Sequence, residues 1–327
     1  MMTNKPNFFA KLEEEIRNTP MPDVAREFLL KQILRLRDNQ VNIMITGATG
    51  AGKSSTINAL FDMSVAKVGT GVDPETMDIK KYELGNLILW DTPGLGDGKE
   101  ADTRHAKNII SKLAEYDEQG NALIDLVLVI LDGGSRDLGT SYELINEVII
   151  PNLGENAKDR ILVAINQCDV AMKGRYWNQE LNRPEPQLEE FLNEKVQSVK
   201  RRIQEGTGVD IEPIYYSAGW SEDGEKQNPY NLTKLLYFIL EHTKKEKRLV
   251  YADKLSQKSE VWKSNDDLKN YSEEVKESFG DALADGIEQG AKLGGAIAGA
   301  PGKVVGAVLG GVVKAGWHLI KSFFSWF

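Results

Sequence analysis

The sequence predicts an α/β fold over residues 40–243, with a mostly parallel sheet that carries helices on both faces. Short apolar runs rich in β-branched residues alternate there with helical patterns, which is the order of elements that produces a parallel sheet. A glycine-rich loop joins the first apolar run to the first helical pattern. Residues 1–39 have the spacing of amphipathic helices, and residues 244–327 read as a helical, glycine-rich tail. We therefore expect three regions.

The spacing of apolar residues in the N-terminal region predicts two helices. Apolar residues recur at helical spacing around Phe8, Leu12 and Ile16, then residues 19–22 carry two prolines that end the run. A second apolar series continues from residue 24 to residue 36. We expect these helices to pack on the α/β domain as a lid, with a partner-binding helix as the alternative.

Residues 47–54 read GATGAGKS, the pattern G-x-x-x-x-G-K-[ST] of a phosphate-binding loop. An apolar run at 41–46 precedes it and a helical pattern at 55–61 follows it, which is the context that the motif requires. Glycines let backbone N–H groups face phosphate oxygens, and the helix N-terminus adds positive charge. The expected nucleotide-binding residues of this loop are Gly47, Thr49, Gly50, Ala51, Gly52, Lys53, Ser54 and Ser55. Lys53 would reach the β- and γ-phosphates as a catalytic residue, and Ser54 would bind Mg²⁺.

A second segment places DTPG at residues 91–94, directly after the apolar run 86–90. A carboxylate at the end of a strand suits Mg²⁺, which assigns Asp91 to the metal. Gly94 offers a backbone N–H that can approach the γ-phosphate, so it counts among the catalytic groups. Alone, such a tetrapeptide would be an ordinary turn.

A third segment selects the base. The apolar run 161–165 ends in NQCD at 166–169, where the Asp169 carboxylate can accept two hydrogen bonds from guanine that adenine does not offer. Unpaired polar groups on the wrong base cost several kcal/mol, which gives discrimination. A fourth segment, 213–219, brings Ser217 and Ala218, whose backbone N–H could bind the guanine carbonyl. Asn166, Gln167, Asp169, Ser217 and Ala218 are the expected base-binding residues.

With these four segments in order, residues 40–243 resemble the P-loop GTPases of the translation-factor-related class. The letters GATGAGKSSTINALF look most like YfjP-like and prophage-encoded bacterial GTPases, and more distantly like immunity-related and septin-like GTPases. The resemblance implies GTP and GDP as ligands with Mg²⁺, and Mg²⁺-dependent hydrolysis of GTP. It also implies a switch threonine that closes on Mg²⁺ and the γ-phosphate. Thr76 is the favoured candidate for this metal-binding and catalytic role, and Thr70 is the competitor.

The chain departs from these relatives at three positions. Gln167 replaces the usual lysine beside the base, which predicts modest nucleotide affinity. Leu95 stands where a water-orienting glutamine is common, which predicts slow hydrolysis. Gly50 stands where potassium-activated relatives have an asparagine, which argues against potassium activation.

Composition narrows the function classes further. The net charge of −9 and pI of about 5.1 argue against broad nucleic-acid binding. Cys168 is the only cysteine, so no intrachain disulfide can form, which fits a reducing cytoplasm. We read it as a small side chain below the base and not as a nucleophile, and the three histidines are too far apart in sequence to suggest a metal site. Arg136 follows the apolar run 123–131 and could be an arginine finger, although a solvated loop arginine is commoner. Residues 174–186 read as a long loop.

The sequence of the tail predicts a charged helical stretch from 244 to about 279. After it, glycines recur four residues apart. They form three series, which are Gly290 with Gly294, Gly295 with Gly299, and Gly302 with Gly306 and Gly310. Trp317, Ile320, Phe324 and Phe327 would share a helical face, flanked by lysines. Such a tail can lie on a membrane, form an oligomer hairpin or pack on the domain. Pro301 and Lys303 disfavour a single membrane span.

The sequence leaves three functions open, the third of which is a binding module that holds GTP without turnover. The first is a slow GTP-hydrolysing switch that acts at a membrane or a protein partner, in the cytoplasm or peripherally at the inner membrane. The second is a nucleotide-dependent assembly protein, with a homodimer through the nucleotide face and hydrolysis as a timer.

Overall fold

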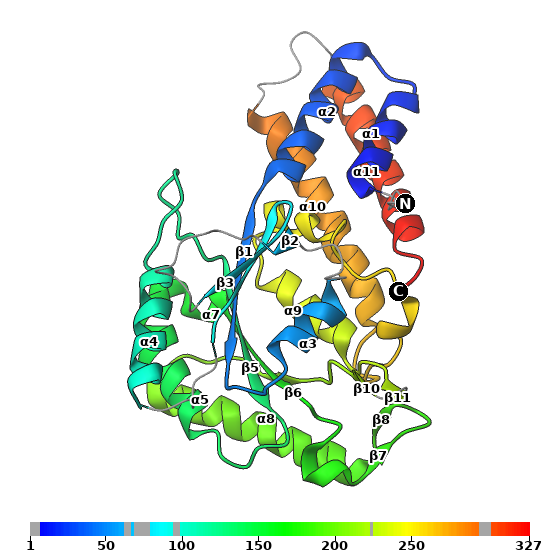
Figure 1. Ribbon diagram of the computed structural model, residues 1–327. Helices are drawn as coiled ribbons and strands as arrows, with labels where there is room; N and C mark the ends of the chain where they lie inside the picture. The colour runs from blue at the N-terminus through cyan, green and yellow to red at the C-terminus, as the bar shows by residue number, and fades with distance from the viewer. Residues whose placement is uncertain (1–6, 62–66, 69–78, 94–98, 223–224, 294–301) are drawn as a thin grey trace. The chain divides into compact units, whose positions relative to one another are not determined.

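The computed structural model describes residues 7–61, 67–68, 79–93, 99–222, 225–293 and 302–327 (Figure 1). The chain divides into two compact units. The sheet unit comprises Val41–Thr243 and Ser256–Lys269. The helical unit comprises Met1–Gln40, Lys244–Leu255 and Asn270–Phe327. The sequence-based division also falls at residue 243, but it assigns 256–269 to the tail.

The sheet unit is built on seven strands in the order β2-β3-β4-β1-β5-β6-β9. Their bounds are β1 Val41–Gly47, β2 Lys67–Val68, β3 Lys80–Leu84, β4 Leu87–Asp91, β5 Leu126–Asp132, β6 Ile161–Asn166 and β9 Ile214–Tyr215. The strands β4, β1, β5, β6 and β9 pair in parallel, and β3 is antiparallel to β2 and β4. The predicted mostly parallel sheet is therefore confirmed.

Helices cover both faces of this sheet (Figure 1). One face carries α4 (Lys99–Leu113), α8 (Pro186–Thr207) and a composite helix of α5 (Gly139–Glu143), a π-helical turn (Leu144–Ile149) and α6 (Ile150–Leu153). The other face carries α3 (Lys53–Leu60) and α9 (Leu232–Glu241). Alternate side chains of β5 and β6 point to each face and are buried, which explains their continuous apolar sequence. Short helical turns complete the unit: Gly154–Asn156, α7 Ala157–Arg160, Ala171–Gly174 and Ser259–Val261.

Two small hairpins extend the sheet unit. The region expected as a long loop contains the antiparallel strands β7 (Trp177–Asn178) and β8 (Arg183–Pro184). Trp177 is buried and packs edge-on against Tyr230, with ring centroids 5.4 Å apart. The second hairpin joins β10 (Trp220–Glu222) to β11 (Glu225–Gln227). Burial of this indole stabilises the hairpin within residues 174–186.

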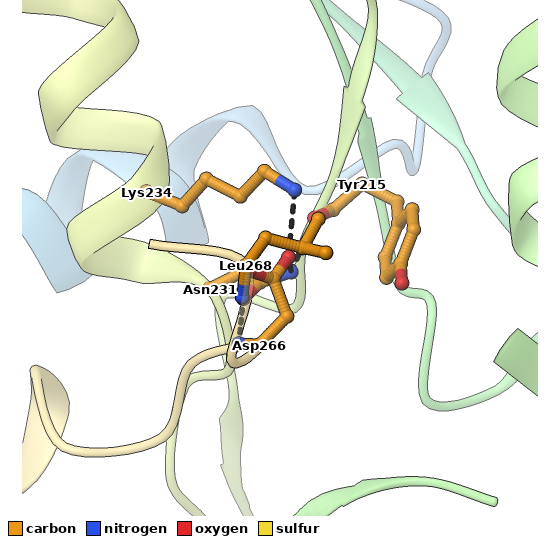
Figure 2. A network of polar contacts seen from close by, with 5 residues as sticks. All are labelled: Tyr215, Asn231, Lys234, Asp266 and Leu268. Atoms are coloured by element: carbon orange, nitrogen blue, oxygen red, sulfur yellow. Dashed lines mark hydrogen bonds and ion pairs between the residues drawn. The ribbon is translucent and has the colours of Figure 1, made fainter. Parts of the chain in front are cut away.

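Residues 256–269 are fastened to the sheet unit by a buried polar network (Figure 2). The Lys234 ammonium lies 2.6 Å from the Asp266 carboxylate, and both side chains are nearly inaccessible to solvent. The Asn231 amide donates to Tyr215 O and to Asp266, and its oxygen accepts from the Asp266 N–H. Breaking a buried ion pair is costly, so this network holds the segment against the end of β9.

The charged helical stretch expected from 244 to about 279 is helical only in parts. Lys245–Tyr251 form a 3₁₀ helix, residues 256–269 cross to the sheet unit, and α10 begins only at Tyr271. The buried side chains of Trp262 and Asp266 are the physical reason, since a helix through this segment would withdraw them from their partners.

The helical unit contains α1 (Phe8–Asn18), α2 (Asp23–Asp38), the Lys245–Tyr251 turn, α10 (Tyr271–Leu293) and α11 (Gly302–Phe323). Both N-terminal helices were predicted. Phe8, Leu12 and Ile16 of the first helix and Leu29, Ile33 and Leu36 of the second are buried, whereas Val24 at the start of the second series is exposed. The core of this unit is aromatic. Phe279 stacks on Phe324 with centroids 4.8 Å apart, and Phe8 meets Phe323 edge-on at 5.4 Å.

Glycines let these helices approach closely. A Cβ added to Gly280 would lie 2.0 Å from the Trp317 ring, and one added to Gly316 would lie 2.4 Å from Leu283. Gly310 has open space around it. Gly294, Gly295 and Gly299 of the predicted small-residue face lie outside the described residues.

The apolar end of the tail does not present an open face. Ile320 and Phe324 are fully buried inside the helical unit, so other parts of the chain cover these two residues and they are not exposed for a membrane or a partner. The N-terminal Phe8 and the ring of Phe279 supply the cover that helical spacing alone could not reveal. Among the described residues, no helix combines the length and the apolar character needed to cross a membrane.

Candidate nucleotide site

The phosphate loop connects β1 to α3 and has the backbone conformation that its glycines allow. Gly50 and Gly52 have φ of +82° and +87°, in the left-handed region that glycine adopts without strain. Close packing restricts this segment as well. A Cβ on Gly47 would lie 2.0 Å from Ile130 O, and one on Gly52 would lie 2.2 Å from Asn166 Nδ2. The loop therefore lies directly against the ends of β5 and β6.

Lys53 begins α3 and folds back over the loop. Its ammonium donates to Gly47 O at 3.1 Å and to Ala48 O at 3.2 Å. Ser54 and Ser55 follow it in the first helical turn and are exposed. The helix N-terminus, an ammonium group and two accessible hydroxyls thus gather at one end of the sheet, an arrangement that suits a polyphosphate.

Asp91 ends β4 beside this loop, paired in register with Ile45 and Lys80. Its Oδ1 atom is buried and, within the described part of the chain, has no hydrogen-bond partner. Burial raises the pKa of Asp91, and the charges of Lys53 and Lys80 oppose that rise. A buried carboxylate oxygen without a donor is a poor structural element but a good ligand for a hard cation. Together with the Ser54 hydroxyl, Asp91 therefore fits Mg²⁺.

Asn166 joins the guanine motif to the phosphate loop. Its Nδ2 donates to Ala51 O at 2.9 Å, and its Oδ1 accepts from Ala218 N at 2.9 Å. Gln167, which has a φ of +60°, donates from Nε2 to Gly50 O at 2.8 Å. Two successive amides thus hold two successive carbonyls of the phosphate loop, so base-binding and phosphate-binding segments form one connected site.

The other base-binding candidates lie at the same place. Asp169 and Ser217 are buried, and Cys168 N donates to Tyr216 O at 3.2 Å. Burial raises the pKa of the Cys168 thiol well above its usual value, so it is unsuited to act as a nucleophile. The Ala218 N–H, predicted for the guanine carbonyl, donates to Asn166 Oδ1 in this structure. A guanine carbonyl would have to share or replace that acceptor.

Several residues that shape the site were missed from the sequence. Thr56 and Tyr216 share a buried hydrogen bond of 2.6 Å that ties α3 to the segment after β9. Gly133 donates its N–H to Asn166 O at 2.7 Å, and Lys195 binds the carbonyls of the same turn. The glycine pair after the apolar run of β5 was a usable signal for Gly133. Thr56 and Lys195 have no local signature, because their partners are distant in sequence.

Some predicted residues cannot be placed. Thr70, Thr76, Gly94 and Leu95 lie outside the described residues. Arg136 is exposed in the turn after β5. In the part of the chain that the structure describes, no group of histidine, cysteine or carboxylate side chains is arranged to hold a metal by itself. Mg²⁺ would thus depend on nucleotide oxygens in addition to Ser54 and Asp91.

Comparison with known proteins bears on this geometry. Residues 42–167, which run from β1 to the guanine motif, match the family described as 50S ribosome-binding GTPase. This part of the chain is similar to that family, and its sheet order and phosphate loop are those of the P-loop GTPase fold. The resemblance to P-loop GTPases is thereby confirmed over a match that ends before the fourth segment at 213–219.

Relatives of the GTPase domain include two proteins of Escherichia coli strain K12. YkfA is 34% identical and YfjP 35% identical over 155 residues, which is 46% of this chain and 50% of each relative. The chain thus matches about half the length of these relatives. Mouse interferon-inducible GTPase 1 is 29% identical over 109 residues, 32% of this chain and 24% of that protein.

Among solved structures, Toc33 from Arabidopsis thaliana in complex with GDP and Mg²⁺ is similar over 74% of this chain and 98% of that one. Its TM-score is 0.41 and its identity 17%, which is too low to bear on function.

Proposed function

We propose that this protein binds GTP together with Mg²⁺ and hydrolyses it slowly to GDP, as a switch. The observation that carries the proposal is the pair of hydrogen bonds through which Asn166 connects Ala51 of the phosphate loop to Ala218 of the base-binding loop. A site with this connection can hold a base and a polyphosphate at once. The single buried, unpartnered oxygen of Asp91 beside it supplies a place for the metal.

In the proposed mechanism, the phosphates draw the Lys53 ammonium away from Gly47 O and Ala48 O, so that Lys53 neutralises the β- and γ-phosphates. Ser54 and Asp91 hold Mg²⁺, which, when bound, offsets charge that develops on the phosphate oxygens. Thr76 and the backbone N–H of Gly94 complete the γ-phosphate contacts in this proposal.

The proposed base contact is the carboxylate of Asp169, which lies buried where β6 ends. A buried acceptor that loses its donors costs about 1–3 kcal/mol or more when charged. Guanine supplies two donors to it and adenine does not, so GTP is favoured over ATP. Slow turnover follows from Leu95, which cannot orient a water molecule.

The test is phosphate release from GTP and ATP by the full chain, with Mg²⁺ or with EDTA. We expect turnover with GTP and Mg²⁺ only, at about one per minute or slower. Lys53→Ala and Ser54→Ala should each abolish it, and Lys53→Ala should also weaken binding. Lys200→Met is the matched control, because Lys200 is a half-buried lysine of α8 that pairs with Asp210 and Glu212. Equal binding of ATP and GTP, or undiminished turnover after Lys53→Ala, would refute the assignment.

The same proposal includes two routes by which the bound nucleotide could control the protein, which are assembly with a second copy and contact with a membrane. Arg136 is exposed in the turn after β5, where a second copy bound at the nucleotide face could meet it. Turnover per molecule that rises with protein concentration, and that Arg136→Ala removes, supports nucleotide-dependent assembly. Turnover that rises only with anionic liposomes supports a switch at a membrane through the tail.

The experiment with anionic liposomes requires the full chain. Ile320 and Phe324 are core residues of the helical unit, so deletion of residues 281–327 would remove buried packing together with any membrane contact. Flotation of the intact protein with and without GTP avoids that confusion. A protein that floats in neither state contradicts the membrane role.

A further inference from the structure

Lys195 is a half-buried lysine in the middle of α8, and its ammonium group binds backbone carbonyls. Nζ donates to Gly133 O and Ser135 O, both at 2.7 Å, and to Asp132 O at 3.3 Å. Burial lowers the pKa of Lys195, and the negative charge of Asp132 opposes this. The three carbonyls lie at the end of β5 and in the turn that follows it. One side chain of α8 therefore fixes the path of that turn.

The same turn also contacts the backbone of Asn166. Gly133 N donates to Asn166 O at 2.7 Å, and Asp132 is the register partner of Asn166 where β5 and β6 end. The packing is too close for a side chain, since a Cβ on Gly133 would lie 2.5 Å from Asn166 O. A displacement of the turn would therefore be felt directly at the Asn166 backbone.

Asn166 in turn connects to the loop that binds phosphate, through Ala51 O. The connected series is Lys195, Gly133, Asn166 and Ala51, with every step a hydrogen bond between 2.7 and 2.9 Å. Hydrogen bonds that involve a charged donor are the stronger ones, and Lys195 makes three of them at the start of the series.

We propose that Lys195 is a positioning residue for the guanine nucleotide, holding the turn at Asp132–Ser135 against Asn166 so that the guanine motif stays aligned with the phosphate loop. The inference rests on the proposed GTP-binding function. Lys195 acts through Asn166 and does not itself touch the nucleotide in this proposal. Its loss should weaken GDP and GTP equally, because the disturbed contact lies on the base side and not at the γ-phosphate.

The experiment compares three variants of the full chain with the wild type. Lys195→Met keeps the aliphatic stem and removes the ammonium. Lys195→Arg keeps a cation with several N–H donors. Lys200→Met, on the same helix, removes an ammonium whose partners are the carboxylates of Asp210 and Glu212. The readouts are the dissociation rate and Kd of a fluorescent GDP and a fluorescent GTP analogue, together with the thermal midpoint of each variant.

We expect Lys195→Met to raise the dissociation rate and Kd of both nucleotides by about tenfold or more, equal to about 1.4 kcal/mol. Lys195→Arg should restore most of the affinity, and Lys200→Met should leave it unchanged. A Lys195→Met protein that is folded at the assay temperature, less heat-stable, and unaltered in nucleotide affinity would show a purely structural lysine and overturn the inference. An equal loss of affinity in Lys200→Met would also overturn it.

A second variant covers the case in which Lys195→Met does not fold. Gly133→Ala disturbs the same contact from the opposite side and should raise nucleotide Kd in the same way, again equally for GDP and GTP. If Gly133→Ala leaves Kd unchanged, the inference fails. Failure of the proposed function is distinguishable, because then the wild type itself would not bind guanine nucleotides.

Discussion

A single methyl group at Gly52 should disconnect the guanine motif from the phosphate loop. The added Cβ would lie 2.2 Å from Asn166 Nδ2, whereas real Cβ atoms essentially never approach another atom closer than 3.0 Å. The Asn166 amide would have to retreat by about 1 Å, which breaks its 2.9 Å hydrogen bond to Ala51 O. Gly52→Ala thus perturbs the central contact of the site without removing any polar group.

The magnitude follows from that hydrogen bond and from the backbone. Leaving a buried donor unsatisfied costs about 1–3 kcal/mol. Gly52 also has a φ of +87°, and a left-handed conformation costs a residue with a side chain about 1–2 kcal/mol. The sum is roughly 3 kcal/mol, and if it falls on nucleotide binding it weakens affinity about 100-fold.

Gly50→Ala is the control that separates strain from displacement. Gly50 has a similar φ of +82°, but a Cβ there would meet nothing within 4 Å. By equilibrium titration with a fluorescent GDP, we expect Gly50→Ala to weaken binding by about tenfold or less. Equal losses in the two variants would refute the argument, because the effect would then come from backbone strain alone.

Four further predictions concern other parts of the molecule. Asp169→Asn should shift preference from guanosine to xanthosine nucleotides, because an amide reverses one donor–acceptor pair; competition binding with XDP and GDP checks this, and an unchanged preference contradicts it. Burial raises the pKa of Asp91 in the folded state above its usual 3.8, so its charge destabilises the nucleotide-free protein at neutral pH, and this cost disappears as the pH falls below that value. Asp91→Asn should therefore raise the Tm of the nucleotide-free protein at pH 7.5, with a smaller gain at low pH, and should abolish Mg²⁺-dependent turnover. Asp266→Ala should cost about 3 kcal/mol in urea unfolding, since it leaves the Lys234 ammonium buried and unpaired, and Lys234→Met combined with Asp266→Leu should recover much of that loss. Phe324→Ala should cost about 3 kcal/mol of stability, measured by the same unfolding experiment, with GDP affinity within about twofold of wild type; a large loss of GDP affinity would contradict this.

The sheet and the motifs could be predicted because their signals are local. Apolar runs such as 126–131 and 161–165 are buried on both sides, so their composition reveals them without knowledge of any partner. The phosphate loop is also local, since its glycines serve backbone conformations within the loop itself. Distant contacts have no such signal. Trp177 packs on Tyr230, and this contact stabilises a hairpin where the sequence predicted a loop. The residues around 177 carry no signal for so distant a partner.

The difference between local signals and distant contacts also explains which features of the nucleotide site could be predicted. Residue types with fixed spacing could be assigned to phosphate, metal and base, but the sequence could not reveal how the segments are held together. Lys195 is one of many lysines on helix surfaces, and its role depends on three backbone carbonyls that lie 60 to 63 residues earlier in the chain. The Ala218 N–H was assigned to a ligand, whereas the structure gives it a protein acceptor in Asn166. The motifs predict which ligand the site can bind, and we expect the hydrogen bonds between the motifs to determine the affinity for that ligand.

The C-terminal helix shows why an apolar stripe has no single meaning in a sequence. Helical spacing of aromatic residues is the same for a face that meets lipid and for a face that meets other helices. The choice depends on whether the chain supplies a cover, and here Phe8 and Phe279 supply it for Phe324. Exposing that ring to lipid would first require separating it from both partners. Contact with a membrane through these residues would therefore require opening of the helical unit.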